Sequence, residues 1–176
     1  ISTPSISEID SGFSWAKHPV TTTKELGDFF LALYAIIGLL LLIALLSYSP
    51  EDPNFIFPEN TNIQNILGFR GSFIADLFYQ SFGVIALLIP FSFIFTGSNI
   101  FLNKKILLII ESLFYTIVYS LFGSLFFSNF YVNTFKLYNN GNGGFIGKYL
   151  ETTFLNSLIN LNVQISYYLL IIIIII

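Results

Sequence analysis

The chain has 176 residues, of which 55% are hydrophobic and only 10% are charged. Soluble domains carry about a quarter charged residues. Because the deficit runs along the whole chain, the composition predicts a polytopic membrane protein rather than a soluble domain with one anchor. The formal net charge of −3 excludes the basic surface that nucleic acid binding needs, and the lack of cysteine excludes disulfides and thiolate metal sites.

Residues 1–28 form a polar segment that is rich in Ser and Thr. The segment lacks a short apolar core preceded by positive charge, so it does not have the pattern of a signal peptide. It contains the single histidine, His18, which has no carboxylate pair nearby and is expected to be solvated. We interpret residues 1–28 as a cytoplasmic N-terminal segment.

Residues 29–176 carry four apolar stretches, which predict an all-α domain with four transmembrane helices. About 20 apolar residues are needed to cross the ~30 Å hydrocarbon layer. The first three passes are expected at residues 29–48, 73–95 and 106–127, the second being interrupted by Pro90 and closed by Gly97. The fourth has only the apolar residues 165–176, so we interpret it as truncated and expect the chain to continue.

The orientation of these passes is predicted from the Lys and Arg residues in the connections between them. With the N-terminus inside, four basic residues are cytoplasmic and three are outside, and the pair in the short connection between passes two and three is the most informative. The N-terminus is therefore predicted to be cytoplasmic, with residues 49–72 and 128–147 in the periplasm. The inside residues are Lys17, Lys24, Lys104 and Lys105, and the outside ones are Arg70, Lys136 and Lys148.

Residues 139–144 form a glycine-rich tract that is expected to be flexible and to lead into a helix. The following Gly147-Lys148 resembles a phosphate-binding loop only superficially, because that motif needs glycine at position 142 and Ser or Thr at position 149. These positions are Asn142 and Tyr149. The chain also lacks the Ser/His, paired Asp and HExxH patterns of intramembrane proteases. We expect no catalytic residue, no metal and no cofactor in this chain.

Two acidic residues adjoin the apolar stretches. Asp76 lies near the start of pass two, and Glu111 lies inside pass three, close to Lys105. Ionisable groups within a membrane are costly and are candidates for function. A proton or ion relay is one interpretation. We favour the other, in which Glu111 is an interfacial charge that extends to the headgroup layer or pairs with a neighbouring helix, because a single pair of acids is weak evidence for a transport path.

The stretch before the last pass has polar residues at every fourth position and Leu, Phe or Ile on much of the other side. On a helix this spacing produces a slanting polar stripe. Asn and Gln side chains can form hydrogen bonds between helices in lipid. The stripe is either a helix on the outer membrane surface or a polar contact between helices or subunits, and both interpretations stay open. Its residues are Lys148, Thr152, Asn156, Asn160 and Gln164.

Three blocks of the chain resemble the N-terminal four-pass membrane domain of the FtsK/SpoIIIE family of bacterial DNA translocases. The first, LSYSPEDPNF at residues 46–55, is similar to the family's Ser-Tyr-x-Pro-x-Asp-Pro-Ser-Phe turn. The second comprises NILGFRGSFIADL at 65–77 and FGVIALLIP at 82–90. The third is GGFIG at 143–147. The family positions that we expect to be structural are Tyr48, Pro50, Asp52, Pro53, Gly68, Gly71, Asp76, Gly83, Pro90, Gly143, Gly144 and Gly147.

Physical roles can be assigned to some of these positions. Gly68 and Gly71 allow a positive φ or a close backbone approach before pass two. Gly83 with Ala86 offers a small-residue patch for helix packing, and Pro90 can kink the helix where neighbours or water satisfy the freed carbonyl.

The resemblance implies a membrane anchor and assembly domain of a septal DNA translocase that acts in cell division and chromosome segregation. It also implies a homo-oligomer in the bacterial inner membrane, contacts with other division proteins, and a motor in a C-terminal part beyond residue 176. This segment itself is expected to contact the lipid bilayer and no nucleic acid. The alternatives are a small transporter or channel subunit that uses Glu111 and Asp76, and an unrelated four-helix membrane scaffold.

Overall fold

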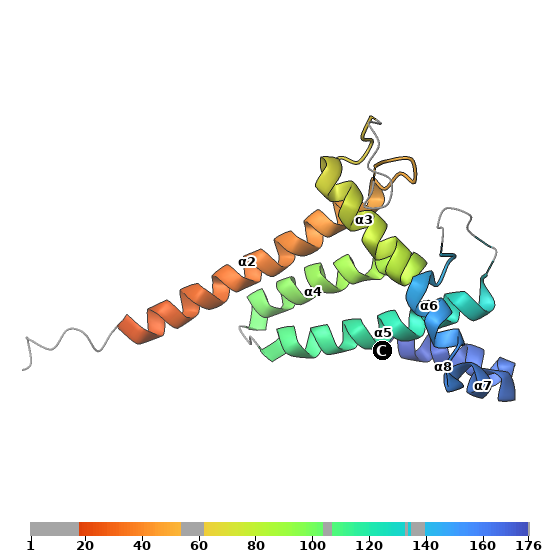
Figure 1. Ribbon diagram of the computed structural model, residues 1–176. Coiled ribbons are helices and arrows are strands. Elements are labelled where there is room, and N and C mark those ends of the chain that lie inside the picture. Colours follow the sequence, from red (N-terminus) through yellow and green to blue (C-terminus); the bar gives the residue numbers. More distant parts are fainter. Residues whose placement is uncertain (1–17, 54–61, 104–106, 133, 135–139, 176) are drawn as a thin grey trace, which may run out of the picture.

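The computed structural model describes residues 18–53, 62–103, 107–132, 134 and 140–175, and every regular element in these ranges is a helix (Figure 1). The elements are α2 (His18–Leu46), α3 (Gly68–Phe82), the 3₁₀ helix η3 (Gly83–Leu87), α4 (Leu88–Asn103), α5 (Leu107–Phe130), α6 (Gly144–Glu151), α7 (Phe154–Leu161) and α8 (Val163–Ile175).

Two helical stretches of the described residues, Gly68–Asn99 and Leu107–Phe130, are long and apolar enough to cross a membrane. A third is counted only if α7 and α8, between which the chain bends by 117°, are taken as one broken span. Helix α2 adds the shorter apolar run Ala32–Leu46. The predicted all-helical polytopic fold is confirmed, and the four-pass arrangement fits it approximately.

Helices α2 and α4 pack closely along one another because glycines replace larger side chains at their contact. A Cβ at Gly38 would lie 2.8 Å from Cβ of Phe93, and a Cβ at Gly97 would lie 2.8 Å from Cβ of Ala35. The prediction that Gly97 closes pass two is therefore wrong. This glycine lies within α4 at a helix contact, and α4 continues to Asn103.

Pass two bends at Gly83, and the predicted kink at Pro90 is wrong. Gly83 has φ 67° and ψ −141°, a conformation that an L side chain rarely adopts, and the 3₁₀ turn η3 follows it. Pro90 is the third residue of α4, where the missing N–H removes no hydrogen bond of the helix. Helix α3 consequently lies obliquely across the ends of α2 and α4 (Figure 1).

The apolar core where α2, α3 and α4 meet lies at the end of the bundle where α2 stops. Small residues alternate with larger ones there, so the helices approach closely. Its buried members are Leu41, Ala44, Leu45, Ala75, Tyr79, Ala86 and Ile89.

The predicted polar stripe does not lie on one helix, because the chain breaks twice after α6. Thr153 caps α7 by accepting a hydrogen bond from the backbone N–H of Leu155 at 3.3 Å. Asn162 is extended, and its Oδ1 accepts from the N–H of Ile165 at 3.0 Å. Ser, Thr, Asn and Asp favour this position at helix N-termini, which explains why the helical stripe is divided among α6, α7 and α8.

Helix α8 folds back along α5, so the two helices share a second core. Phe126 of α5 packs with its ring centroid 5.3 Å from that of Tyr167 in α8. The hydroxyls of Tyr131 and Tyr167 lie 3.1 Å apart and are hydrogen-bonded. The buried members of this core are Leu125, Phe126, Ile159 and Leu170.

Candidate functional site

The C-terminal carbonyls of α2 receive hydrogen bonds from side chains that follow much later in the chain. Nδ2 of Asn65 donates to the carbonyls of Ala44 at 2.8 Å and Ser47 at 3.2 Å. The Tyr79 hydroxyl donates to the carbonyl of Leu45 at 3.0 Å. A helix leaves its last carbonyls without intrahelical partners, and an unsatisfied one costs several kcal/mol in lipid. These side chains therefore allow α2 to end next to the hydrocarbon layer.

The buried carboxylate of Asp52 joins the turn after α2 to the segment before α3. The side chain is only 4% exposed, and its two oxygens accept from the backbone N–H groups of Gln64 at 2.7 Å and Asn65 at 2.9 Å. The neighbouring carbonyl of Pro53 accepts from the hydroxyl of Ser72 at 3.2 Å. Burial of a carboxylate is tolerated only when such donors replace water.

Asp76 lies in the same region. The Tyr48 hydroxyl donates to Oδ1 of Asp76 at 3.0 Å, and Nε2 of Gln80 donates to the same oxygen at 3.4 Å. We call Tyr48, Asp52, Asn65, Asp76 and Tyr79 the α2 cap.

Two glycines adjoin this cap, one for its backbone conformation and one for its lack of a side chain. Gly68, with φ 67°, starts α3, and its N–H donates to the carbonyl of Asn65 at 2.8 Å. A Cβ at Gly71 would lie 2.2 Å from Oδ1 of Asn65. Gly71 is thus the position where any side chain would displace the Asn65 carboxamide. Of the predicted turn prolines, Pro53 is buried beside the cap, whereas Pro50 is exposed.

A second junction, which we call the glycine junction, brings together four of the predicted glycines: Gly83, Gly143, Gly144 and Gly147. A Cβ at Gly83 would lie 1.9 Å from the carbonyl oxygen of Asn142. Cβ atoms at Gly143 and Gly147 would lie 2.4 and 2.5 Å from the carbonyl oxygen of Ser124. The bend after α3, the helix α5 and the start of α6 therefore touch backbone to backbone.

Hydrogen bonds hold the glycine junction together. The N–H of Val84 donates to the carbonyl of Asn142 at 2.9 Å, and the Ser124 hydroxyl donates to the carbonyl of Phe82 at 3.1 Å. The Asn142 side chain is 1% exposed and donates to the carbonyl of Tyr131. The expected flexible tract is in fact buried and hydrogen-bonded at residues 142–144, although it does lead into the helix α6 as predicted.

The sequence interpretation missed a stripe of hydroxyl residues on α5. They recur every four residues, which places them on one helix face, and this spacing was the available signal. The members have different partners: Ser112 bonds to Thr96 on α4, while Ser124 belongs to the glycine junction. The hydroxyls of Thr116 and Ser120 are buried and have no partner in good hydrogen-bonding geometry within the described residues, although Thr116 lies near the Tyr119 hydroxyl. The stripe comprises Ser112, Thr116, Ser120, Ser124 and Ser128.

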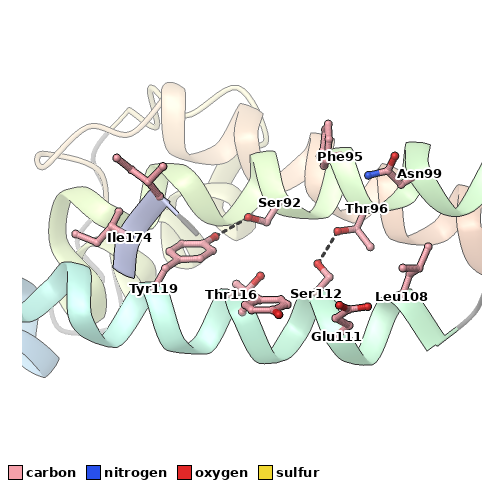
Figure 2. Close-up of a pocket in the computed structure, with 12 residues that line it drawn as sticks. Ser92, Phe95, Thr96, Asn99, Leu108, Glu111, Ser112, Thr116, Tyr119 and Ile174 are labelled. Carbon is pink, nitrogen blue, oxygen red and sulfur yellow. Dashed lines mark hydrogen bonds between the residues drawn. The ribbon is translucent and has the colours of Figure 1, made fainter. Parts of the chain in front are cut away.

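A groove of about 550 Å³ lies along the stripe, between α4, α5 and the end of α8 (Figure 2). The hydroxyls of Ser92 and Tyr119 form a 2.8 Å hydrogen bond across it. Glu111 lines the groove near the start of α5, where its side chain is exposed. We call this feature the α4–α5 groove.

The structure does not bring Asp76 and Glu111 together. Asp76 bonds to Tyr48 at the end of α2, whereas Glu111 shares the groove with the α4 residues on either side of Gly97. Gly97 contacts Ala35 of α2, so the two acids are separated by about thirteen helical residues, or about 20 Å along α2. They cannot exchange a proton directly.

The remaining candidate residues, Asn156, Asn160 and Gln164, lie outside the α2 cap and the glycine junction. Nδ2 of Asn160 donates to Oδ1 of Asn156 at 3.4 Å within α7, and Gln164 is exposed at the start of α8. Among the residues that the structure describes, no three His, Cys, Asp or Glu side chains come together as a metal site would require.

Comparison with known proteins finds relatives that are named DNA translocase FtsK and a relative that is uncharacterised. The chain is 41% identical over 69 residues to the DNA translocase FtsK of Rickettsia bellii, and 32% identical over 89 residues to that of Azospirillum brasilense. These alignments cover 39% and 49% of this chain, and 9% and 14% of the relatives. An uncharacterised protein of Haemophilus influenzae is 37% identical over 73 residues, which are 41% of this chain and 68% of that protein.

The aligned part of this chain thus spans only about a tenth of the length of the FtsK relatives it matches. No solved structure matches the chain significantly. The family model described as "4TM region of DNA translocase FtsK/SpoIIIE" matches residues 23–176. This match takes in the whole α2 cap, the glycine junction and the α4–α5 groove. The chain therefore belongs to the family of four-pass membrane regions of the DNA translocases FtsK and SpoIIIE.

Proposed function

We propose that this chain is the membrane anchor and assembly domain of a septal DNA translocase that acts in cell division and chromosome segregation. The observation that carries the proposal is the family match over residues 23–176, together with relatives named DNA translocase FtsK. The domain sits in the bacterial inner membrane with its N-terminus in the cytoplasm. A motor in a further part of the protein pumps DNA, so this segment contacts lipid and protein but no nucleic acid.

The glycine junction supports an anchoring role on physical grounds. An anchor that holds a motor against a load must not deform, and contacts between backbones leave no flexible side chains between the elements. Gly83 and Gly144 place α3 and α6 in such contact. The anchor also forms a homo-oligomer and binds other division proteins, and the exposed Asn160 and Gln164 are candidates for such contacts.

The transporter alternative is less well supported. It depends on Glu111 and Asp76 acting together, and these lie at different ends of the bundle. Proton or ion flux in proteoliposomes separates the two functions. We expect no flux from wild type or from Glu111→Gln, whereas flux in wild type that disappears in the variant would favour the transporter.

Localisation tests the anchor itself. Residues 1–176 fused to a fluorescent protein should accumulate at the division septum of a rod-shaped bacterium. The matched control is an unrelated four-helix membrane segment with the same fluorescent protein, which should spread over the whole membrane. Equal distributions of the two fusions would contradict the assembly role.

A further inference from the structure

The α4–α5 groove has two different ends. Glu111 and Asn99 line the end near the start of α5, and Tyr119 with Ile174 of α8 lines the deeper end (Figure 2). Phe95 lines it as well and is 70% exposed, so the groove opens sideways between the helices. In a membrane, that opening faces lipid.

One polar atom in the groove is left without a partner. Thr116 is only 6% exposed and lines the groove, and its hydroxyl has no partner in good hydrogen-bonding geometry among the described residues: the Tyr119 hydroxyl lies near it but is bonded to Ser92. The neighbouring polar side chains are already paired: Tyr119 with Ser92, and Thr96 with Ser112. A buried hydroxyl without a partner costs free energy in an apolar medium. The site thus favours an occupant that supplies a hydrogen-bond acceptor at the depth of Thr116.

The charge of the groove indicates which chemical group of the occupant lies at the Glu111 end. Among the described residues that line it, Glu111 is the only charged one. A carboxylate at the edge of a membrane is stabilised by a cation. An ammonium group that also donates hydrogen bonds to the carboxylate forms the stronger, charge-assisted contact.

The spacing of the two groups matches the polar layer of a bilayer. Thr116 is five residues beyond Glu111, which is about 7.5 Å along the helix. The polar layer of one leaflet is roughly 5–8 Å thick, because a bilayer of about 40–45 Å contains a hydrocarbon core of about 30 Å.

We propose that the α4–α5 groove binds one phosphatidylethanolamine molecule. The lipid ammonium donates to the Glu111 carboxylate, an ester oxygen of the glycerol region accepts from the Thr116 hydroxyl, and an acyl chain lies against Phe95 and Ile174. Phosphatidylcholine has the same esters, but its ammonium carries no N–H, and phosphatidylglycerol carries no cation. This site is independent of the anchor function proposed above.

Native mass spectrometry of the full-length protein in detergent tests the proposal. The protein is incubated with equal amounts of dioleoyl phosphatidylethanolamine, phosphatidylcholine and phosphatidylglycerol, and the retained lipid is counted. Wild type should retain phosphatidylethanolamine preferentially. Glu111→Gln should weaken its retention about tenfold or more, because a hydrogen bond to a charged group is lost. The control is Glu151→Gln, which changes a carboxylate at the end of α6 that does not line the groove.

A second variant tests the contact with the ester region separately from the contact with the ammonium group. Thr116→Val should lower the retention of phosphatidylethanolamine and phosphatidylcholine by the same factor, because the ester region is common to both. Equal retention of the two lipids by wild type would overturn the proposal, as would a preference that survives in Glu111→Gln. Retention of no lipid by wild type would also overturn it.

Discussion

The side-chain amide of Asn65 donates a 2.8 Å hydrogen bond to the carbonyl of Ala44, which lies 21 residues earlier in the chain. The same amide reaches the carbonyl of Ser47 at 3.2 Å, and Oδ1 of Asn65 accepts from the N–H of Leu67 at 3.0 Å. One carboxamide thus connects the end of α2 with the start of α3.

The first prediction concerns this contact. Asn65→Ala should lower the free energy of unfolding by about 1–3 kcal/mol, because buried carbonyls at the end of α2 lose their donor. Unfolding in mixed detergent micelles with increasing SDS, followed by circular dichroism, measures the change. Gln64→Ala is the control, since its side chain is exposed while its backbone N–H still bonds to Asp52. Equal destabilisation by both variants would contradict the role of Asn65.

The second prediction ranks three glycine-to-alanine variants by the same assay. Gly68 has a positive φ but nothing within 4 Å of a Cβ, so Gly68→Ala should cost only about 1–2 kcal/mol of backbone strain. Gly147 has no positive φ, but a Cβ would lie 2.5 Å from the carbonyl oxygen of Ser124, and such overpacking costs about 1–3 kcal/mol. Gly83 combines both problems and should be the most sensitive. A Gly83→Ala variant as stable as Gly68→Ala would show that the glycine junction can adapt.

The third prediction compares two serines of the α5 stripe. Ser124→Ala should cost about 0.5–1.5 kcal/mol, because the carbonyl of Phe82 loses its donor. Ser120→Ala should be neutral or stabilising, because its hydroxyl is buried with no hydrogen bond in the described part of the chain. Both variants remove one oxygen from the same helix, so each serves as the control for the other. A loss of stability in Ser120→Ala that equals the loss in Ser124→Ala would argue against this distinction.

The fourth prediction concerns topology. The chain has no cysteine, so single cysteines can be introduced without background. Asn62→Cys is exposed near the α2 cap and should react with a membrane-impermeant thiol reagent in intact spheroplasts. Lys105→Cys, in the connection between α4 and α5, should react only after the membrane is permeabilised. The reverse pattern would place the N-terminus outside.

The class of the protein and the approximate positions of its apolar helices could be predicted from the amino-acid sequence alone. Pass three was predicted at residues 106–127 and is the helix α5, Leu107–Phe130. Pass one was predicted to end near Tyr48, and α2 ends at Leu46. These features depend on the length of an apolar run and on local helix breakers, and both are properties of neighbouring residues. The family blocks likewise located most residues of the α2 cap and the glycine junction.

The bend of pass two and the contacts of the polar side chains, in contrast, depend on how the helices pack against one another. The local rule placed the bend of pass two at Pro90, but it occurs at Gly83, where the carbonyl of Asn142 approaches so closely that only glycine fits. The stripe through Asn156 and Gln164 was divided at Asn162, which caps a new helix. The two breaks have different causes: the cap at Asn162 is a local contact over three residues, whereas the bend at Gly83 depends on a carbonyl that comes much later in the chain. Hydrophobic periodicity reports burial along one helix, whereas the position of a bend depends on a backbone atom supplied by a distant part of the chain.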